Sequence, residues 1–170
     1  MTTKTEALAL IEREWRAGDS LFAGLSEEQL ARPVFTGEGS GWRVRDLPPH
    51  FAWWLRLAAR GARRAVEIGS GPDQNTTLRR FLGIETGVDT LNADTHARWH
   101  GRPAADLFAE LRSAREDLRA ALAALPDDLL VNADSVETDG MHRYIWQPAV
   151  NHFRQHREHI ESALKEGAAT

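Results

Sequence analysis

Apolar side chains recur along the chain at the three- and four-residue spacing of amphipathic α-helices. The first stripe lies in the N-terminal segment and consists of Leu8, Ile11, Trp15 and Phe22. A capping-box pattern over 26–29 predicts a short helix that ends at Pro33. A second long helix is predicted from about Val44 to Ile68, with Asp46 as its N-cap and a double proline in its first turn.

The second predicted helix has one apolar face, made by Leu47, Phe51, Trp54, Leu57 and Ala58. Adjacent tryptophans cannot both face the core, so Trp54 is expected inside and Trp53 at a helix–helix seam or a dimer surface. The alternative interpretation places one of the two indoles in the lining of a ligand pocket.

The second half of the chain continues the helical pattern. A loop is expected over 72–83, followed by a shorter helix from Val88 to Trp99. The next stripe is the most regular and consists of Leu107, Leu111, Ala114, Leu118, Leu122 and Leu125. The polar stretch 131–143 is predicted as a short hairpin or a loop, and the last helix runs from about Tyr144 to Lys165. Four long helices and short accessory ones predict an all-α fold with one domain over 1–170.

Composition narrows the chemistry without changing this fold. The 170 residues include 21 Lys and Arg against 25 Asp and Glu, which gives a formal net charge of -4. The chain therefore lacks the excess of positive charge that is typical of nucleic-acid-binding proteins. There are no cysteines, so disulfides, thiolate zinc sites and cysteine nucleophiles are excluded. No apolar run approaches the ~20 residues of a membrane span, and no signal-peptide pattern is present. A cytoplasmic protein that does not bind nucleic acid or membranes is therefore expected.

Two of the seven histidines share one face of the last helix. His156 lies on the apolar stripe, and His152 precedes it by one turn, so both imidazoles can reach one metal ion. The same spacing is also typical of core histidines held by ordinary hydrogen bonds. His159, three residues beyond His156, makes the pair His156 and His159 an alternative.

Other histidines differ in their surroundings. His50 lies between Leu47 and Trp54 on the apolar side of the second helix, where metal ligation or a hydrogen bond would offset its desolvation. His96 and His100 repeat the four-residue spacing, but their segment is polar and they are predicted to be exposed at a helix end.

Three segments together resemble one known group of proteins. Residues 42–54, WRVRDLPPHFAWW, resemble the W-x-V-x-D-L-x-x-H-x-x-x-W signature that opens helix two of DinB-like proteins. Residues 152–160, HFRQHREHI, resemble the H-Y-x-x-H segment of the last helix in that superfamily. Residues 89–92 and 101–103 are similar to the middle of the branch that contains the colibactin self-resistance protein.

The resemblance implies a four-helix bundle of up-down-down-up topology, which often forms a homodimer. It also implies a metal site made by His50, His152 and His156. All-imidazole ligation suits zinc, nickel, iron or copper, and zinc or nickel is the ion expected here. Three protein ligands with an open position are typical of a catalytic metal.

Related families include mycothiol-dependent maleylpyruvate isomerases and bacillithiol transferases. The resemblance therefore implies a metal-dependent enzyme that acts on a small electrophile by thiol transfer or hydrolysis, with a low-molecular-weight thiol as a candidate cofactor. Detoxification, by opening or sequestering a reactive toxin, is a variant of the same hypothesis. The alternative is a non-catalytic, dimeric binding or interaction module, because this fold constrains function only loosely.

Overall fold

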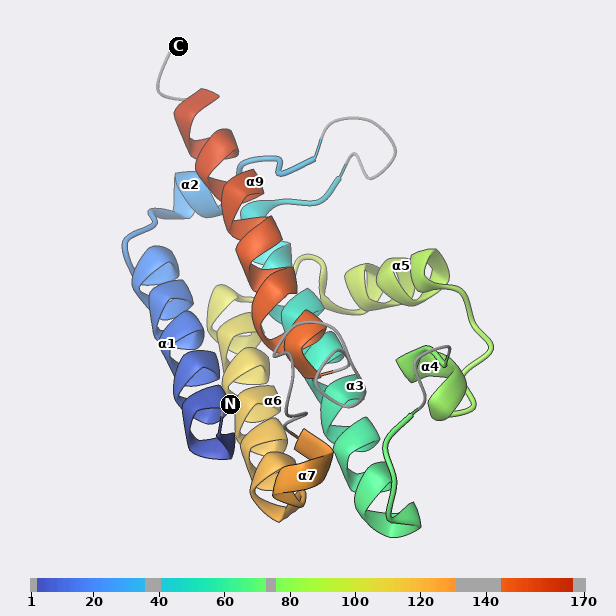
Figure 1. Cartoon of the computed structure of the whole chain (residues 1–170). Helices are drawn as coiled ribbons and strands as arrows, with labels where there is room; N and C mark the ends of the chain where they lie inside the picture. The colour runs from blue at the N-terminus through green and yellow to red at the C-terminus, as the bar shows by residue number, and fades with distance from the viewer. Residues whose placement is uncertain (1–2, 36–40, 73–75, 131–144, 167–170) are drawn as a thin grey trace.

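Four long helices lie side by side in the computed structural model, which describes residues 3–35, 41–72, 76–130 and 145–166 (Figure 1). They are α1 (Lys4–Ala23), α3 (Leu47–Ile68), α6 (Ala104–Ala124) and α9 (His152–Glu166). Helix α3 packs against α6 and α9, and α9 packs against α1. The described residues contain no strand, so the predicted all-α class is confirmed, whereas the up-down-down-up topology stays a prediction.

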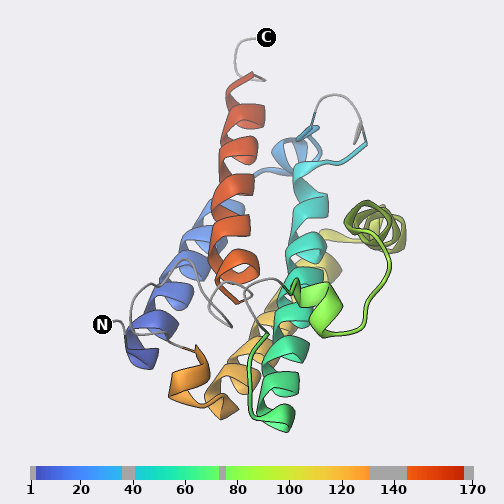
Figure 2. The same cartoon turned by 45° about the vertical axis from the view of Figure 1, so that its right-hand side comes forward.

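Short helices connect the long ones. They are α2 (Glu27–Leu30), the 3₁₀-helix η1 (Val44–Asp46), α4 (Leu78–Phe81), α5 (Val88–Trp99), α7 (Asp127–Leu130) and the π-helix η2 (Gln147–Asn151). Helix α5 has the predicted bounds and lies beside α3 in both views (Figure 2). The loop expected over 72–83 is partly wrong, because Thr77 caps the short helix α4 there. The predicted hairpin or loop over 131–143 lies outside the described residues.

The helix starts follow local capping chemistry. Ser26 and Gln29 form the capping box that the sequence predicts for α2. The N-cap of α3 is Asp46, but its carboxylate accepts from the backbone N–H of Arg43 and thereby closes the preceding 3₁₀ turn. Both prolines lie in the first turn of α3, where a missing N–H removes no helical hydrogen bond. This start brings His50 to the first turns of α3, on its buried side.

The inner faces of the long helices form one apolar core. The predicted stripe of α6 is buried along its whole length, and Ile11, Trp15 and Phe22 of α1 are buried with it. Charged side chains tie the same helices together at the surface, where Arg56 of α3 pairs with Glu110 of α6. None of the helices in the described ranges has the length and apolar character of a membrane span.

Candidate metal centre

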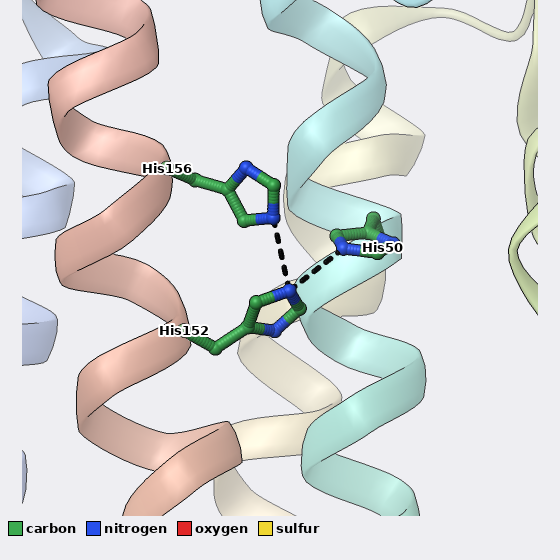
Figure 3. Close-up of side chains that lie close together, drawn as sticks. All are labelled: His50, His152 and His156. Atoms are coloured by element: carbon green, nitrogen blue, oxygen red, sulfur yellow. Dashed lines mark hydrogen bonds between the residues drawn. The ribbon is translucent and has the colours of Figure 1, made fainter. Parts of the chain in front are cut away.

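Three histidines meet between α3 and α9 (Figure 3). His50 comes from the first turns of α3, and His152 and His156 come from successive turns of α9. The Nε2 atom of His152 lies 2.9 Å from that of His50 and 2.9 Å from that of His156. The structure thus brings together the three residues that the family resemblance implies as metal ligands.

A π-helical turn precedes the first of these histidines on α9. Helix η2 contains Pro148 and ends directly before His152. The indole N–H of Trp15 donates to the carbonyl of Ala149 over 3.1 Å, which ties this wider turn to α1. The sequence predicted a regular helix here, so that expectation is locally wrong, and Pro148 was the only signal. Such π-turns recur at functional sites, where they change the rotation of the helix that follows.

Burial keeps the three imidazoles uncharged near neutral pH. Desolvation, reinforced by His152 and His156, lowers the pKa of His50 well below its ordinary value. Burial also lowers the pKa of His152 to about 4 and that of His156 to about 3, with smaller contributions to the latter from His152 and His159. Neutral imidazoles present a lone pair, which is the form that binds metal ions.

The donor set fits a divalent transition metal. Nitrogen ligands of one tetrahedral zinc ion, each at ~2.0–2.1 Å from the metal, lie roughly 3.3 Å apart, and the two Nε2 pairs, at 2.9 Å, are a few tenths of an ångström closer than that. Hydrogen bonds alone satisfy the cluster poorly. Nε2 of a neutral His152 either donates one proton or accepts with one lone pair, so it can form a normal hydrogen bond with only one of its two neighbours. The opposite ring atoms, Nδ1 of His50 and of His152, are buried without a partner in the described structure.

His159 contacts His156 but is not one of the three converging histidines. Its Nδ1 lies 3.3 Å from Nδ1 of His156, on the side of that ring that faces away from Nε2. Its own ring is exposed and packs edge-on against Phe35. The alternative pair of His156 and His159 therefore does not share the point on which His50 and His152 converge.

The three histidines form part of the wall of a cavity of about 590 Å³. The other lining residues come from the 31–46 segment, α3 and α5, and are Phe35, Trp42, Trp54, Val88, Asp89, Asn92 and Ala93. The expectation that Trp54 belongs to the core is wrong, because this indole is only partly buried and lines the cavity. Trp54 Nε1 and Asn92 Oδ1 are buried polar atoms without a partner in the described structure.

The prediction that His96 and His100 are exposed at a helix end is confirmed for His100, at the end of α5, and is wrong for His96. His96 is largely buried, and both rings approach the carboxylate of Asp46, which is only 4% exposed. Asp46, His96 and His100 form a second group whose potential ligand atoms lie within 4.8 Å of one another. The sequence prediction missed this contact because Asp46 was assigned only as a helix cap.

Comparison with known proteins supports the fold and the family. The model of the mycothiol maleylpyruvate isomerase N-terminal domain matches residues 11–152, a range that contains His50 and ends at His152. A crystal structure of an uncharacterised protein from Escherichia coli UTI89 superposes with a TM-score of 0.71 at 17% identity, covering 99% of this chain and 96% of that chain. At this identity the likeness shows the fold alone. No curated protein matches the chain.

Proposed function

Because the chain belongs to the mycothiol maleylpyruvate isomerase N-terminal domain family of the DinB-like superfamily, we propose that it is a metal-dependent enzyme acting on a small electrophile. The observation that carries this proposal is the convergence of three neutral imidazoles on one point in the wall of a cavity. A structural zinc site has four protein ligands, whereas three ligands beside a cavity leave a position for substrate or cofactor.

In this proposal His50, His152 and His156 hold the metal, and zinc or nickel is the expected ion. A divalent ion bound there supplies a Lewis acid that favours the ionised form of a thiol. The burial that keeps the three rings neutral also excludes bulk water from one side of the site. Trp54 and Asn92 line the cavity beside the three histidines and, in this proposal, contact the ligand.

Thiol transfer fits these residues better than hydrolysis does. Among the described residues that line the cavity, Asp89 is the only carboxylate, and its side chain is exposed. A bound metal can itself ionise water near neutral pH, but hydrolysis then needs a positioned group that donates a proton to the leaving group. A thiol has an ordinary pKa of about 8.5, so a metal ion needs to lower this pKa only modestly for the thiol to ionise near neutral pH. A low-molecular-weight thiol such as mycothiol is therefore the proposed cofactor.

Metal analysis combined with a conjugation assay tests this function. The chain is purified without a histidine tag, and its metal content is measured before thiol transfer from mycothiol, bacillithiol or glutathione to chlorodinitrobenzene is followed. We expect at least one metal ion per chain and thiol-dependent turnover in the wild-type protein. His156→Ala should lose turnover and one metal ion per chain, whereas Gln155→Ala, an exposed neighbour on α9, should keep both.

The outcomes separate the candidate functions. Unchanged metal content in His156→Ala would refute the ligand assignment. Metal binding with hydrolysis of a p-nitrophenyl ester, but without thiol transfer to the electrophile, would favour the hydrolase. Metal-free protein without either activity would favour the non-catalytic binding module.

A further inference from the structure

A second cluster of possible metal ligands lies where the end of α5 meets the start of α3. Asp46 closes η1 and precedes α3, while His96 lies in the last turn of α5 and His100 is the residue that directly follows this helix. The three side chains come from segments about fifty residues apart in the sequence, and their ligand atoms lie within 4.8 Å of one another. Two imidazoles and one carboxylate are a common donor set for divalent transition metals.

The distances within this cluster favour ligands of a common ion over hydrogen-bonded partners. His96 Nε2 lies 3.5 Å from Asp46 Oδ2, and His100 Nδ1 lies 3.6 Å from Asp46 Oδ1. Both separations are too long for good hydrogen bonds. They are close to the roughly 3.3 Å that separates two ligands of a tetrahedral zinc ion with metal–ligand distances of ~2.0–2.1 Å.

The polar atoms of the cluster are also incompletely satisfied. The nearly buried carboxylate of Asp46 accepts one backbone hydrogen bond, from Arg43 over 2.8 Å. Within the described ranges, its only ion-pair contacts are the two long ones to His96 and His100. His96 Nε2 is buried and has no hydrogen-bond partner there. A buried carboxylate with so few partners is costly unless a positive charge compensates it.

We propose that Asp46, His96 and His100 bind a second divalent transition-metal ion, separate from the histidine triad on α3 and α9. The partial exposure of His100, 43%, lets the ion enter and leaves room for water as a further ligand. This site does not depend on the function proposed above, because none of its three ligands lines the cavity.

A metal ion bound at the second site would link the end of α5 to the start of α3 and restrict the movement of α5 relative to α3. That attachment matters for the cavity, because Val88, Asp89, Asn92 and Ala93 of α5 form one of its walls. Trp42 lies between the two groups of histidines, with ring centroids 5.2 Å from His50 and 4.7 Å from His96. The second ion therefore holds the cavity wall in place, whereas the first lies inside the cavity.

Zinc stoichiometry at equilibrium tests the second site. After dialysis against buffered free zinc, we expect two ions per chain in the wild type and one in each of His156→Ala and His100→Ala. The double variant should bind none, and Asp94→Asn, which removes an exposed carboxylate from α5, should keep two. His96→Gln provides a second variant in case His100→Ala folds poorly. Two ions in a folded His100→Ala or His96→Gln protein, or none in His156→Ala, would overturn the proposal.

Hydrogen exchange tests whether the second ion restricts the movement of α5. In the His156→Ala background, zinc can act only through the second site, so it should slow amide exchange over 88–99. The same addition should leave exchange unchanged in His156→Ala/His100→Ala. Equal exchange with and without zinc in the first variant would overturn this role of the second ion. Failure of the thiol-transfer assay would leave both results intact, so the two proposals fail independently.

Discussion

His156 has a different neighbour at each ring nitrogen. Its Nε2 faces His152, and its Nδ1 lies 3.3 Å from Nδ1 of His159. If Nε2 binds the metal, Nδ1 carries the proton and donates it to His159. Histidine ligands commonly donate their second ring N–H in this way, which fixes the tautomer and the orientation of the ring. His159 is therefore a positioning residue and not a ligand.

His159→Ala should keep the metal stoichiometry and weaken metal affinity by about 10-fold to 100-fold, because the acceptor for His156 Nδ1–H is lost. Competition with a chelator of known affinity measures this change. Gln155→Ala, on the exposed face of the same helix, is the matched control and should bind metal like the wild type. Complete loss of the triad metal in His159→Ala would instead identify His159 as a ligand.

The lowered pKa values predict that the metal-free protein loses stability in acid. His152 and His156 titrate at about 4 and about 3 in the folded chain, against about 6.5 in an unfolded chain. Between these values the unfolded chain binds more protons, so stability is greatest above about pH 6.5 and falls as the pH drops toward 4. Thermal melts of chelator-treated protein across this range measure the effect.

The acid effect has its own control. In His156→Gln one of these groups no longer titrates, so the fall of melting temperature between about pH 6.5 and about pH 4 should be shallower than in the wild type. An identical pH profile in the two proteins would show that other groups dominate acid unfolding.

At the scale of the helices, apolar periodicity predicted the long elements because each buries a continuous stripe. It failed at α4, which has only four residues, and at η2, where a π-turn interrupts the spacing before His152. It also missed the approach of α5 to Asp46, because that contact joins segments about fifty residues apart, which helical spacing does not relate. Spacing alone paired His152 with His156, and only the family resemblance added His50 to them.

The contact between α1 and α9 depends on the absence of a side chain at Gly18. A Cβ atom at this position would lie 2.7 Å from Cζ and 2.8 Å from Cε2 of Phe153, which is buried next to His152. Both distances are well inside van der Waals contact. The aromatic ring lies in the core, so the strain would pass to the backbone of α9.

Gly18→Ala should therefore destabilise the fold. Overpacking costs about 1–3 kcal/mol and outweighs the gain of up to ~1 kcal/mol in helix propensity. Urea unfolding measures the difference, and Phe153→Leu in the same chain should restore part of it. Gly24→Ala is the control, because a Cβ atom there would lie 3.7 Å from its nearest neighbour and the φ of -85° suits alanine. A more stable Gly18→Ala protein would contradict this account of the α1–α9 contact.

At the scale of the whole molecule, the homodimer and the lack of nucleic-acid binding stay predictions. The net charge of -4 is unfavourable for a polyanion, since the electrostatic part of such binding needs clustered cations. Arg56 and Arg63 of α3, which form part of a basic stretch in the sequence, are paired with Glu110 and Asp117 of α6. Their charge is thereby balanced within the chain and is less available to a partner.

Metal binding should be visible in the stability of the whole chain, because a site assembled from α3 and α9 does not exist in the unfolded state. With free zinc at about 100 times the dissociation constant, one site adds about 2.7 kcal/mol. For a chain of this size, that corresponds to a rise in melting temperature of about 5–11 °C. Thermal unfolding in zinc buffers should show a rise of at least this size in the wild type, which has both sites, and a smaller rise in His156→Ala, which keeps only the site at Asp46. His156→Ala/His100→Ala should show none, and a full rise in that double variant would mean that zinc stabilises the fold through other residues.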